Sequence, residues 1–568
     1  MNRWLWRLAW GITASAVLLT GLLVSSRPPG PAWAQTGFWQ RATCTQITTP
    51  AGGQSFCFEQ ASNTLKAWNG ATWTQINASA TRVNNIRDYG ATGDGTTNDA
   101  PAVQAAHDAL PTSGGTLYFP RGIYQFSTVR LNFNRPIALV CDGWASVLTW
   151  NVTGLTNPGG NDLGVLNIRS AASGAALDWV KIHNCAFEFG GTRNAEYAEG
   201  RRGLNIYRAN NIDIRGNRFN GGVGEMVGLG NMDTPIGTRA WITNNVFTDF
   251  AQGGLNPNVF DVTVTGNTFL SGVTAVEAGR SGFLFAGNTL RDMSSTCVNL
   301  ASVASATVTN NRFDTCAWFP GAGVLGAINV AANGANEPTA SATLANNVVT
   351  FASATHANLA GITLDRGTAT SDNAAITIVG NTLSGVRQCI SVVSLLDGLI
   401  ESNVCVGSSA SGAGIILASG GQVQRTAVSG NNIRQFAART VNPTTNGPIQ
   451  DASAPGSDNN TVSWNIQEGA LVLGPTGRVD FADGATTPSV QRPAGIYYVA
   501  NSAPTTITQL SNATIGQVVI LVFDDANTSI TDGGNFALAG NFTSSANDVL
   551  MLVTRDGTNW HEISRSAN

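Results

Sequence analysis

The sequence has few charged residues, few histidines and no cluster of metal-ligating residues. Asp, Glu, Lys and Arg make up 12% of its 568 residues, and it has 4 histidines. Because it has neither a CxxC spacing nor a Cys/His cluster, no metal site is predicted. A net charge of −4 and the absence of a basic run give no support for nucleic-acid binding. Low charge together with 64 glycines is typical of a turn-rich, all-β extracellular protein.

Long apolar runs are also missing, except near the N-terminus. Arg3 and Arg7 begin a stretch that continues as the apolar run Leu8–Val24, and Ala32–Ala34 reads Ala-Trp-Ala, a small-x-small cleavage site. We therefore predict a signal peptide at 1–34 and a secreted or cell-surface protein that does not contact the membrane after cleavage. An uncleaved membrane anchor is the alternative, although the apolar run is short for a membrane span.

The cysteines number 8 and would lie in an oxidising compartment after secretion. Their order along the chain suggests local pairs. Cys44 with Cys57 is the best supported pair, because it closes a small loop in a segment with little other core. The other candidate pairs are Cys141 with Cys185, Cys297 with Cys316, and Cys389 with Cys405. The cysteines of these three pairs could instead be reduced and buried inside the fold.

A four-residue phrase with asparagine at its second position recurs through the middle of the chain. It reads Gly-Asn-Arg-Phe at Gly216–Phe219 and Gly-Asn-Thr-Leu at Gly380–Leu383. The asparagines assigned to the phrase are Asn217, Asn245, Asn267, Asn288, Asn311, Asn347, Asn381, Asn403 and Asn432. Their shortest spacings lie near 22 residues, and residues that alternate apolar and polar precede the phrase, as in Val262–Thr265. A repeat of this length, with strands and no room for a crossover helix, predicts a parallel β-helix.

The recurring asparagines are expected to serve architecture and not catalysis. Asparagine suits a tight bend, because its side chain bonds the backbone and tolerates left-handed geometry. Stacked from coil to coil, the side chains would form an amide ladder. A degenerate earlier coil is expected at His183–Phe187.

The sequence on either side of the repeats indicates further units. Thr64–Ile76 reads as a hairpin around Asn69-Gly70. Asp99–Leu110 reads as an amphipathic helix with Asp99 as its cap, which would cover the exposed end of the solenoid core. The predicted organisation is a signal peptide at 1–34, a small β unit at 35–79, a β-helix at 80–470 with coils from about 136, a linker at 471–496 and a C-terminal β-domain at 497–568.

One segment carries a family resemblance. Asp88–Phe126 contains DYGATGDGTTNDAPAVQAAHDAL followed by GGTLYFPRGIYQF. It resembles the N-terminal signature of the pectate lyase superfamily, which includes polygalacturonase-like hydrolases, lyases, epimerases and phage tailspikes. With the repeats, the resemblance covers about 85–470 and implies an all-β protein: a right-handed single-stranded parallel β-helix with an N-terminal capping helix. The segment Pro504–Ser566 resembles the small β-domains that end such surface and tailspike-like chains.

The resemblance does not identify a reaction, because this fold hosts several chemistries. The Asn-Thr-Asp, Gly-His-Gly and Arg-Ile-Lys phrases of polygalacturonases are absent, as is the Asp-Pro-His phrase of alginate epimerases. The only Asp-Asp pair, Asp524-Asp525, lies in the C-terminal domain. No catalytic residue is therefore transferred from the family.

Aligning the coils by their asparagines brings one outward position into register in the strand that follows each phrase. Flanking residues such as Val276 and Ala278 are apolar and are expected to point inward. The tracked position holds Gly228, Asn256, Glu277, Asn299, Asn329, Thr363 and Ser391. Its polar centre would extend about 15 Å at the usual strand spacing. We expect Asn256, Asn299 and Asn329 to bind sugar hydroxyls.

Glu277 is the predicted acid or base of this row. Glycoside hydrolysis needs a second carboxylate, for which Asp249 or Glu225 is the candidate. A lyase or epimerase needs a base and a cation that neutralises a uronate, and Arg280 could supply that charge. The alternative is a solvated polar face without chemistry. No cofactor is predicted, and calcium remains an open possibility that no motif indicates.

The favoured function is binding of an extracellular polysaccharide, with cleavage or modification by a lyase, hydrolase or epimerase reaction left open. A non-catalytic surface or adhesion protein is the first alternative. A tailspike-like assembly protein is the second. The sequence is compatible with a monomer or a homotrimer.

Overall fold

The computed structural model describes 38–41, 56–59, 64–68, 73–75, 82–151, 164–170, 175–190, 202–222, 224–230, 237–280, 282–316, 325–331, 339–351, 359–365, 372–408, 414–417, 423–436, 449–451, 460–463, 465–467, 470–472, 479–490, 495–513 and 515–566. The chain divides into a unit up to Ala80 and a second unit from Thr81 onward. In the described part of the chain, no helix is long and apolar enough to cross a membrane.

The N-terminal unit contains a four-stranded sheet. Its strands are, in order, β1 (Phe38–Arg41), β2 (Phe56–Glu59), β3 (Thr64–Trp68) and β4 (Trp73–Gln75). β3 and β4 pair antiparallel with Trp68 opposite Trp73, which confirms the hairpin, although Asn69 and Gly70 lie outside the described residues. Cys57 is buried and disulfide-bonded, but its expected partner Cys44 and the predicted signal peptide at 1–34 also lie outside them.

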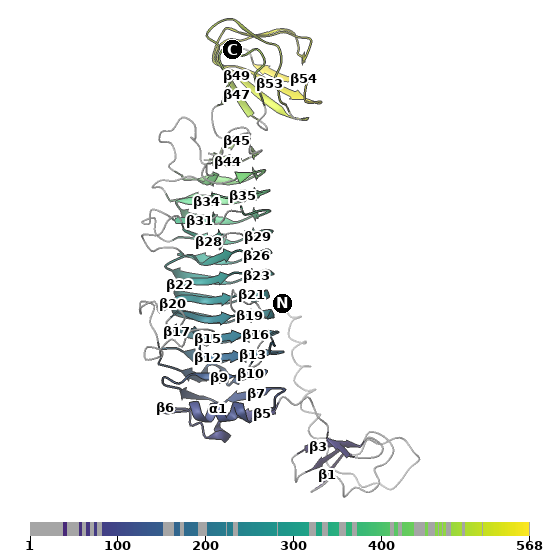
Figure 1. Cartoon of the computed structure of the whole chain (residues 1–568). Helices are drawn as coiled ribbons and strands as arrows, with labels where there is room; N and C mark the ends of the chain where they lie inside the picture. The colour runs from purple at the N-terminus through teal and green to yellow at the C-terminus, as the bar shows by residue number, and fades with distance from the viewer. Residues whose placement is uncertain are drawn as a thin grey trace, which may run out of the picture. The chain divides into compact units, whose positions relative to one another are not determined.

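The second unit is dominated by a right-handed parallel β-helix, seen in Figure 1 as a stack of coils. One wall is a 14-stranded sheet. Its strands are β5 (Arg82–Asn85), β7 (Gly115–Phe119), β10 (Ile137–Cys141), β13 (Val180–His183), β16 (Ile212–Arg215), β19 (Thr238–Thr243), β21 (Phe260–Thr265), β23 (Phe283–Ala286), β26 (Ala306–Thr309), β29 (Ala342–Ala345), β32 (Thr377–Val379), β36 (Leu399–Glu401), β40 (Ala427–Ser429) and β43 (Thr461–Ser463). Since β5 and β7 belong to this wall, the coils begin well before the expected start near 136.

The remaining walls form a 25-stranded sheet that bends around the core. Its strands are β6 (Asp94–Asn98), β8 (Gly122–Gln125), β9 (Leu131–Phe133), β11 (Ser146–Thr149), β12 (Gly164–Arg169), β14 (Ala186–Glu188), β15 (Arg202–Tyr207), β17 (Arg218–Gly222), β18 (Glu225–Leu229), β20 (Val246–Pro257), β22 (Thr268–Ala278), β24 (Thr289–Met293), β25 (Val298–Ala301), β27 (Arg312–Asp314), β28 (Leu325–Ala331), β30 (Val348–Thr350), β31 (Leu359–Leu364), β33 (Thr382–Val386), β34 (Gln388–Val392), β37 (Val404–Gly407), β38 (Ile415–Leu417), β41 (Asn432–Arg434), β42 (Ile449–Asp451), β44 (Asn465–Gln467) and β45 (Ala470–Val472). A short pair, β35 (Leu395–Leu396) with β39 (Val423–Gln424), lies beside it. Only β45, at the far end, runs antiparallel to its neighbour in this sheet.

Inward side chains stack into one continuous core. The residue two positions after each recurring asparagine faces inward, and Phe219, Phe247 and Phe269 stack with ring centroids 5.0 and 4.6 Å apart. These side chains are fully buried. The period-two pattern read from the sequence therefore corresponds to inward and outward faces of each strand.

The recurring asparagines form the expected ladder at one corner of the β-helix. In each step, the Oδ1 atom of one asparagine accepts hydrogen bonds from the backbone N–H and the Nδ2 atom of the asparagine one coil earlier, at 2.9 and 3.0 Å between Asn217 and Asn245. The ladder residues are Asn217, Asn245, Asn267, Asn288, Asn311, Asn347, Asn381, Asn403, Asn431 and Asn465, all at most 2% exposed.

One assignment in this series was wrong by one residue. Asn431, and not Asn432, accepts from Asn403, at 3.0 and 2.9 Å. The phrase in this coil is Gly-Asn-Asn-Ile, and two consecutive asparagines made the sequence register ambiguous. The degenerate coil at His183–Phe187 is confirmed, with Cys185 at the ladder position donating its backbone N–H to Asn217.

The helix α1 (Ala100–Asp108) covers the first coil, next to the 3₁₀ segment η2 (Ile86–Tyr89). A second 3₁₀ segment, η3 (Gly143–Ala145), follows β10. Asp99 precedes α1 but makes no side-chain capping bond to it, which corrects the expected cap. Its carboxylate instead accepts from the backbone N–H groups of Thr92 and Gly93, at 2.7 and 3.2 Å, and so fixes the preceding loop.

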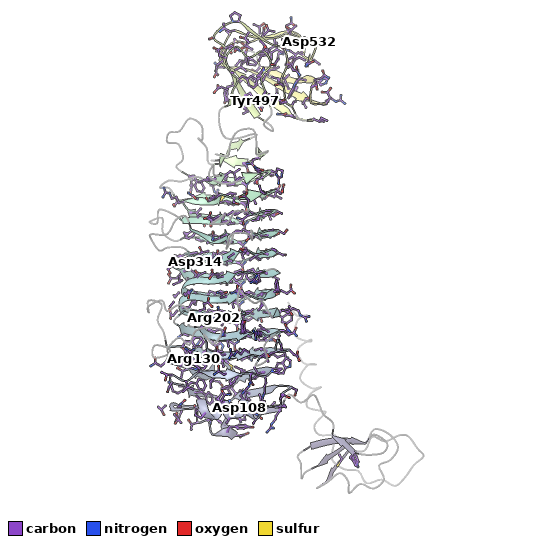
Figure 2. All side chains as sticks on the ribbon, viewed as in Figure 1. Asp108, Arg130, Arg202, Asp314, Tyr497 and Asp532 are labelled. Atoms are coloured by element: carbon purple, nitrogen blue, oxygen red, sulfur yellow. A yellow bond between two sulfur atoms is a disulfide. The ribbon has the colours of Figure 1, made fainter. Side chains whose placement is uncertain are left out.

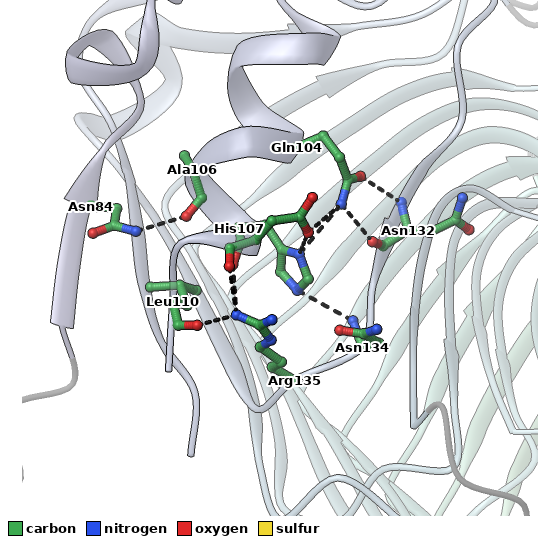
Figure 3. A network of polar contacts seen from close by, with 9 residues as sticks. Asn84, Gln104, Ala106, His107, Leu110, Asn132, Asn134 and Arg135 are labelled. Carbon is green, nitrogen blue, oxygen red and sulfur yellow. Dashed lines mark hydrogen bonds and ion pairs between the residues drawn. The ribbon is translucent and has the colours of Figure 1, made fainter. Parts of the chain in front are cut away.

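Polar contacts tie α1 to the coil beneath it (Figure 3). His107 is 1% exposed and stacks on Phe133 with ring centroids 4.7 Å apart. Its Nδ1 atom lies 2.9 Å from Asp108, and its Nε2 atom accepts from the backbone N–H of Asn134 at 3.3 Å. The guanidinium of Arg135 donates to the carbonyl of Asp108 at 2.9 Å, close to the end of the helix.

Three of the expected cysteine pairs are disulfides in the β-helix: Cys141–Cys185, Cys297–Cys316 and Cys389–Cys405. The C-terminal domain has its own buried core, which includes Val490, Tyr497 and Trp560. Its sheets contain β46 (Val479–Asp480), β47 (Gly495–Val499), β48 (Thr505–Ile507), β49 (Val518–Phe523), β50 (Thr528–Ile530), β51 (Phe536–Ala537), β52 (Phe542–Thr543), β53 (Asp548–Thr554) and β54 (Trp560–Ser566). Because β46 pairs with β47, the domain's sheet includes residues that the sequence assigned to a linker at 471–496.

Candidate functional site

The outward position tracked through the sequence forms one continuous row in the 25-stranded sheet. Backbone pairing joins Gly228 to Asn256, Glu277 to Asn299, and Asn299 to Asn329. Leu255 pairs with Val276, which places Asn256 beside Glu277. We call this set the Glu277 row, and its members in chain order are Asn132, Asn167, Asn205, Gly228, Asn256, Glu277, Asn299, Asn329, Thr363 and Ser391.

The first three members were missed from the sequence. The alignment began at Gly228, because the recurring phrase begins at Asn217. A usable signal was present, since an asparagine between two apolar residues occurs at Leu131–Phe133, Leu166–Ile168 and Leu204–Ile206. The same apolar-Asn-apolar pattern surrounds Asn299 and Asn329 further along the row.

Amides in the Glu277 row hydrogen-bond to one another and are less exposed than an open polar face would be. Asn167 and Asn205 are 0% and 2% exposed, and Asn256 is 9% exposed. In the three coils that follow Glu277, each side-chain donor of the row points back toward Glu277. Thr363 donates to Asn329 at 2.6 Å, Asn329 to Asn299 at 2.9 Å, and Asn299 to Glu277 Oε1 at 3.5 Å. The carboxylate of Glu277 therefore ends a chain of hydrogen bonds.

Glu277 is half-buried, and its surroundings favour the protonated form. Burial raises its pKa above the usual value, and the nearby negative charge of Glu225 raises the pKa further. The hydrogen bond from Asn299 acts in the opposite direction. A carboxyl group with a raised pKa is suited to exchange a proton closer to neutral pH than an exposed glutamate.

Glu225 has a different environment. Its carboxylate lies 2.5 Å from Arg202 Nε in an ion pair whose side chains are 13% and 14% exposed. Asn256 donates to the same carboxylate at 2.6 Å, so Glu225 contacts the Glu277 row from the side. Arg202, labelled in Figure 2, lies over Gly228, where an added Cβ would come within 2.6 Å of the guanidinium. Glycine in the row thus leaves room for the Arg202 side chain.

The other two candidates lie further along the chain. Asp249 is exposed and has a left-handed backbone, with φ of 56°, at a corner of β20. It lies seven residues before Asn256, which is about 20 Å or somewhat more along an extended strand. Arg280 is half-buried and follows the end of β22, three residues after Glu277. Of the predicted carboxylates, the structure brings Glu225 into electrostatic contact with Glu277.

In the described part of the chain, no group of three or more His, Cys, Asp or Glu side chains is placed to hold a metal ion. The tryptophans of the β-helix, which could stack on sugar rings, differ in exposure. Trp150 is 1% exposed, Trp144 and Trp241 are exposed, and Trp318 lies outside the described residues.

Comparisons with known proteins agree with this fold. Residues 83–318 match the family model described as rhamnogalacturonase A/epimerase, pectate lyase-like. The chain is 36% identical over 89 residues to mannuronan C5-epimerase AlgE1, and 30% identical over 102 residues to alginate lyase 7, both of Azotobacter vinelandii. These alignments cover 12% and 15% of this chain and only 6% and 12% of those proteins.

Solved structures that superimpose on this chain include an exopolygalacturonase from Thermotoga maritima and PfbA, a surface adhesin of Streptococcus pneumoniae. The first has a TM-score of 0.46 at 11% identity and covers 69% of this chain and 94% of its own. The second has a TM-score of 0.43 at 12% identity and covers 86% of this chain and 99% of its own.

Proposed function

We propose that this chain, a member of the pectate lyase-like superfamily, binds an extracellular polysaccharide along the Glu277 row and transfers a proton to or from it through Glu277. The observation that carries the proposal is Glu277 itself. It is the one carboxylate in a row of amides, it is half-buried, and its pKa is raised. Amides bind sugar hydroxyls without adding charge, and the carboxyl group is the member of the row that can exchange a proton.

Glycoside hydrolysis is the first reaction class. It uses two carboxyl groups in different environments, one of which donates a proton to the leaving oxygen. Glu277 has the raised pKa that a general acid needs. Glu225 would supply the second carboxylate after Arg202 moves to the substrate or to solvent, because in this structure it is held by Arg202.

A uronate lyase or epimerase reaction is the second class, and two observations favour it. The matching curated relatives are by name a mannuronan C5-epimerase and an alginate lyase. Arg280 follows Glu277 by three residues, just after the end of β22, and would neutralise a uronate carboxylate while Glu277 removes a proton. Secretion belongs to the same proposal and is supported by the three disulfides of the β-helix.

The test is a screen of the full chain against plant, algal and bacterial polysaccharides, read for new reducing ends and for unsaturated products. New reducing ends alone identify a hydrolase, and unsaturated ends identify a lyase. An epimerase gives neither and is identified by the changed configuration of the uronate residues in NMR spectra of the polymer. Glu277→Gln keeps the shape of the side chain and should lower turnover about 100-fold or more while binding largely survives. Asn329→Ala is the matched control in the row and should affect binding more than turnover. Full activity of Glu277→Gln would show that the reaction does not take place at the Glu277 row.

A further inference from the structure

A second surface lies on the outer face of the 14-stranded sheet, away from the Glu277 row. Trp241 on β19 is 41% exposed and Trp144 in η3 is 45% exposed. By contrast, Trp150 and Trp560 are at most 1% exposed, and Trp179 is half-buried. Among the tryptophans whose exposure the structure describes, Trp144 and Trp241 are the two exposed ones, and amphipathic aromatic rings at a surface are typical of binding sites.

The two rings belong to the same face. The indole N–H of Trp144 donates to the carbonyl of Gly216 at 2.7 Å, which fixes this ring beside the end of β16. Trp241 pairs through its backbone with Asp213, three residues before Gly216 in the same strand region. Three residues of strand span about 10 Å, and neighbouring coils are about 4.8 Å apart. The distance from Gly216, where the Trp144 ring is held, to the backbone of Trp241 is therefore comparable to the length of a disaccharide.

Two cationic side chains, Lys181 and Arg215, belong to the same outward rows. Lys181 pairs with Asp213 in the outward row that contains Trp241, and its Nζ lies 5.7 Å from the centre of the Trp179 ring. Arg215 belongs to the next outward row and is exposed.

The six outward residues of β13, β16 and β19 in these two rows are Lys181, His183, Asp213, Arg215, Trp241 and Thr243. The single carboxylate among them, Asp213, is already paired with His183 at 3.1 Å and with Arg215. Together with Trp144 these residues form what we call the tryptophan face.

We propose that the tryptophan face binds an anionic saccharide chain. The apolar faces of sugar rings would stack on Trp144 and Trp241, and carboxylate or sulfate groups of the chain would pair with Lys181 and Arg215. A nucleic acid fits less well, because a phosphate backbone calls for a longer cationic track and the whole chain has a net charge of −4. The preset position of the Trp144 ring lowers the entropy lost on binding.

The strand residues of the tryptophan face and those of the Glu277 row belong to different sheets, so the inference does not depend on proton transfer by Glu277. The face would hold the polymer to the protein whether or not a reaction takes place. Binding there adds a second point of attachment, which raises the affinity for a long chain relative to a short one.

The experiment measures binding of the full chain to polygalacturonate, to its uncharged methyl ester and to dextran sulfate, by calorimetry at low and high salt. Trp241→Ala should weaken binding of the polyanion about 10-fold, and Trp241→Phe should restore most of it. Lys181→Gln should weaken binding several-fold and reduce its salt dependence. Thr263→Ala, one coil further along the row of Trp241, is the matched control and should bind like the parent.

Equal binding by the parent, Trp241→Ala and Lys181→Gln overturns the proposal, as does equal affinity for the methyl ester. Preference for polygalacturonate or dextran sulfate decides between a uronate and a sulfated chain. If no polysaccharide is turned over but binding depends on Trp241, the proposed reaction fails and the tryptophan face stands. If turnover of short oligosaccharides depends on Glu277 but no binding depends on Trp241, the proposed reaction stands and the tryptophan face fails.

Discussion

Asn217 and Asn245 occupy the same corner of adjacent coils, and a single oxygen of Asn245 accepts both the backbone N–H and the side-chain N–H of Asn217. The Nδ2 atom of Asn217 also donates to the carbonyl of Ile182 at 2.8 Å. One side chain thus satisfies buried groups on both neighbouring coils. Burying a polar group without a partner is costly, so the fold tolerates few substitutes at this corner.

The corrected ladder register gives the first prediction. Asn431→Ala should lower the free energy of unfolding by at least about 1 kcal/mol, because the backbone N–H of Asn403 and the carbonyl of Ile400 lose their partner. Asn432→Ala, at the adjacent outward position of β41, is the control and should change stability by less than about 0.5 kcal/mol. Thermal and denaturant melts of both variants provide the measurement. A larger loss of stability for Asn432→Ala than for Asn431→Ala would show that Asn432, and not Asn431, belongs to the ladder.

The second prediction concerns pH and the N-terminal cap. Burial lowers the pKa of His107, although the Asp108 carboxylate opposes this effect. The Nε2 atom accepts a hydrogen bond from the Asn134 backbone, which requires the neutral ring. Since the native pKa lies below that of an unfolded histidine, about 6.5, the stabilisation is complete above that pH and is lost as the pH falls through the native pKa.

A series of melts between pH 7.5 and 4.5 tests this. The parent should exceed His107→Gln in stability at neutral pH, and the difference should shrink toward acid pH. A constant difference at every pH would show that protonation of His107 does not control the cap.

The third prediction concerns the stability cost of Glu277. A raised native pKa means that the folded protein favours the protonated form. The cost of ionising Glu277 is therefore absent at pH near 4 and grows as the pH rises through the native pKa. Glu277→Gln should melt higher than the parent at pH 7.5 and close to it at pH 4. Glu225→Gln is the contrasting variant and should melt lower than the parent at pH 7.5, because Arg202 loses its buried partner. Equal melting of Glu277→Gln and the parent at both pH values would argue against the raised pKa.

The fourth prediction concerns the C-terminal domain. Its strands form sheets separate from those of the β-helix, and its core is a separate cluster. Limited proteolysis should cut between Val472 and Val479 and release a folded fragment that begins at or before β46. Mass spectrometry of the fragments and circular dichroism of the released piece provide the readout. Absence of a cut between Val472 and Val479, or cleavage only after β46, would place the domain boundary elsewhere.

Much of the β-helix could be predicted from sequence because its signals are local and repeated. The phrase around Asn267 carries a strand, a bend and an inward aromatic residue in a few consecutive positions. Because the phrase repeats, the sequence also predicts the register of Asn256, Glu277 and Asn299, which strand pairing confirms. The first coils were harder to place, because Cys185 replaces the asparagine at the ladder position.

The details of the candidate site depend on contacts between coils, which sequence spacing does not reveal. Nothing in the sequence shows that Arg202 crosses over Gly228 to reach Glu225, or that Asp99 bonds the preceding loop and not its own helix. Burial is equally hidden, since Asn256 and Thr363 point away from the core and are still 9% and 4% exposed.

The ladder also explains how the chain accommodates length variation. Successive ladder residues are separated by intervals as short as 21 residues, from Asn267 to Asn288, and as long as 36, from Asn311 to Asn347. The hydrogen bonds are nevertheless 2.8 and 3.1 Å at these two steps. The extra residues therefore do not shift the register of the ladder in the coils that follow. Insertions and deletions in this chain should therefore be tolerated in whole loops, and homologues of unequal length can be compared coil by coil from the ladder asparagine.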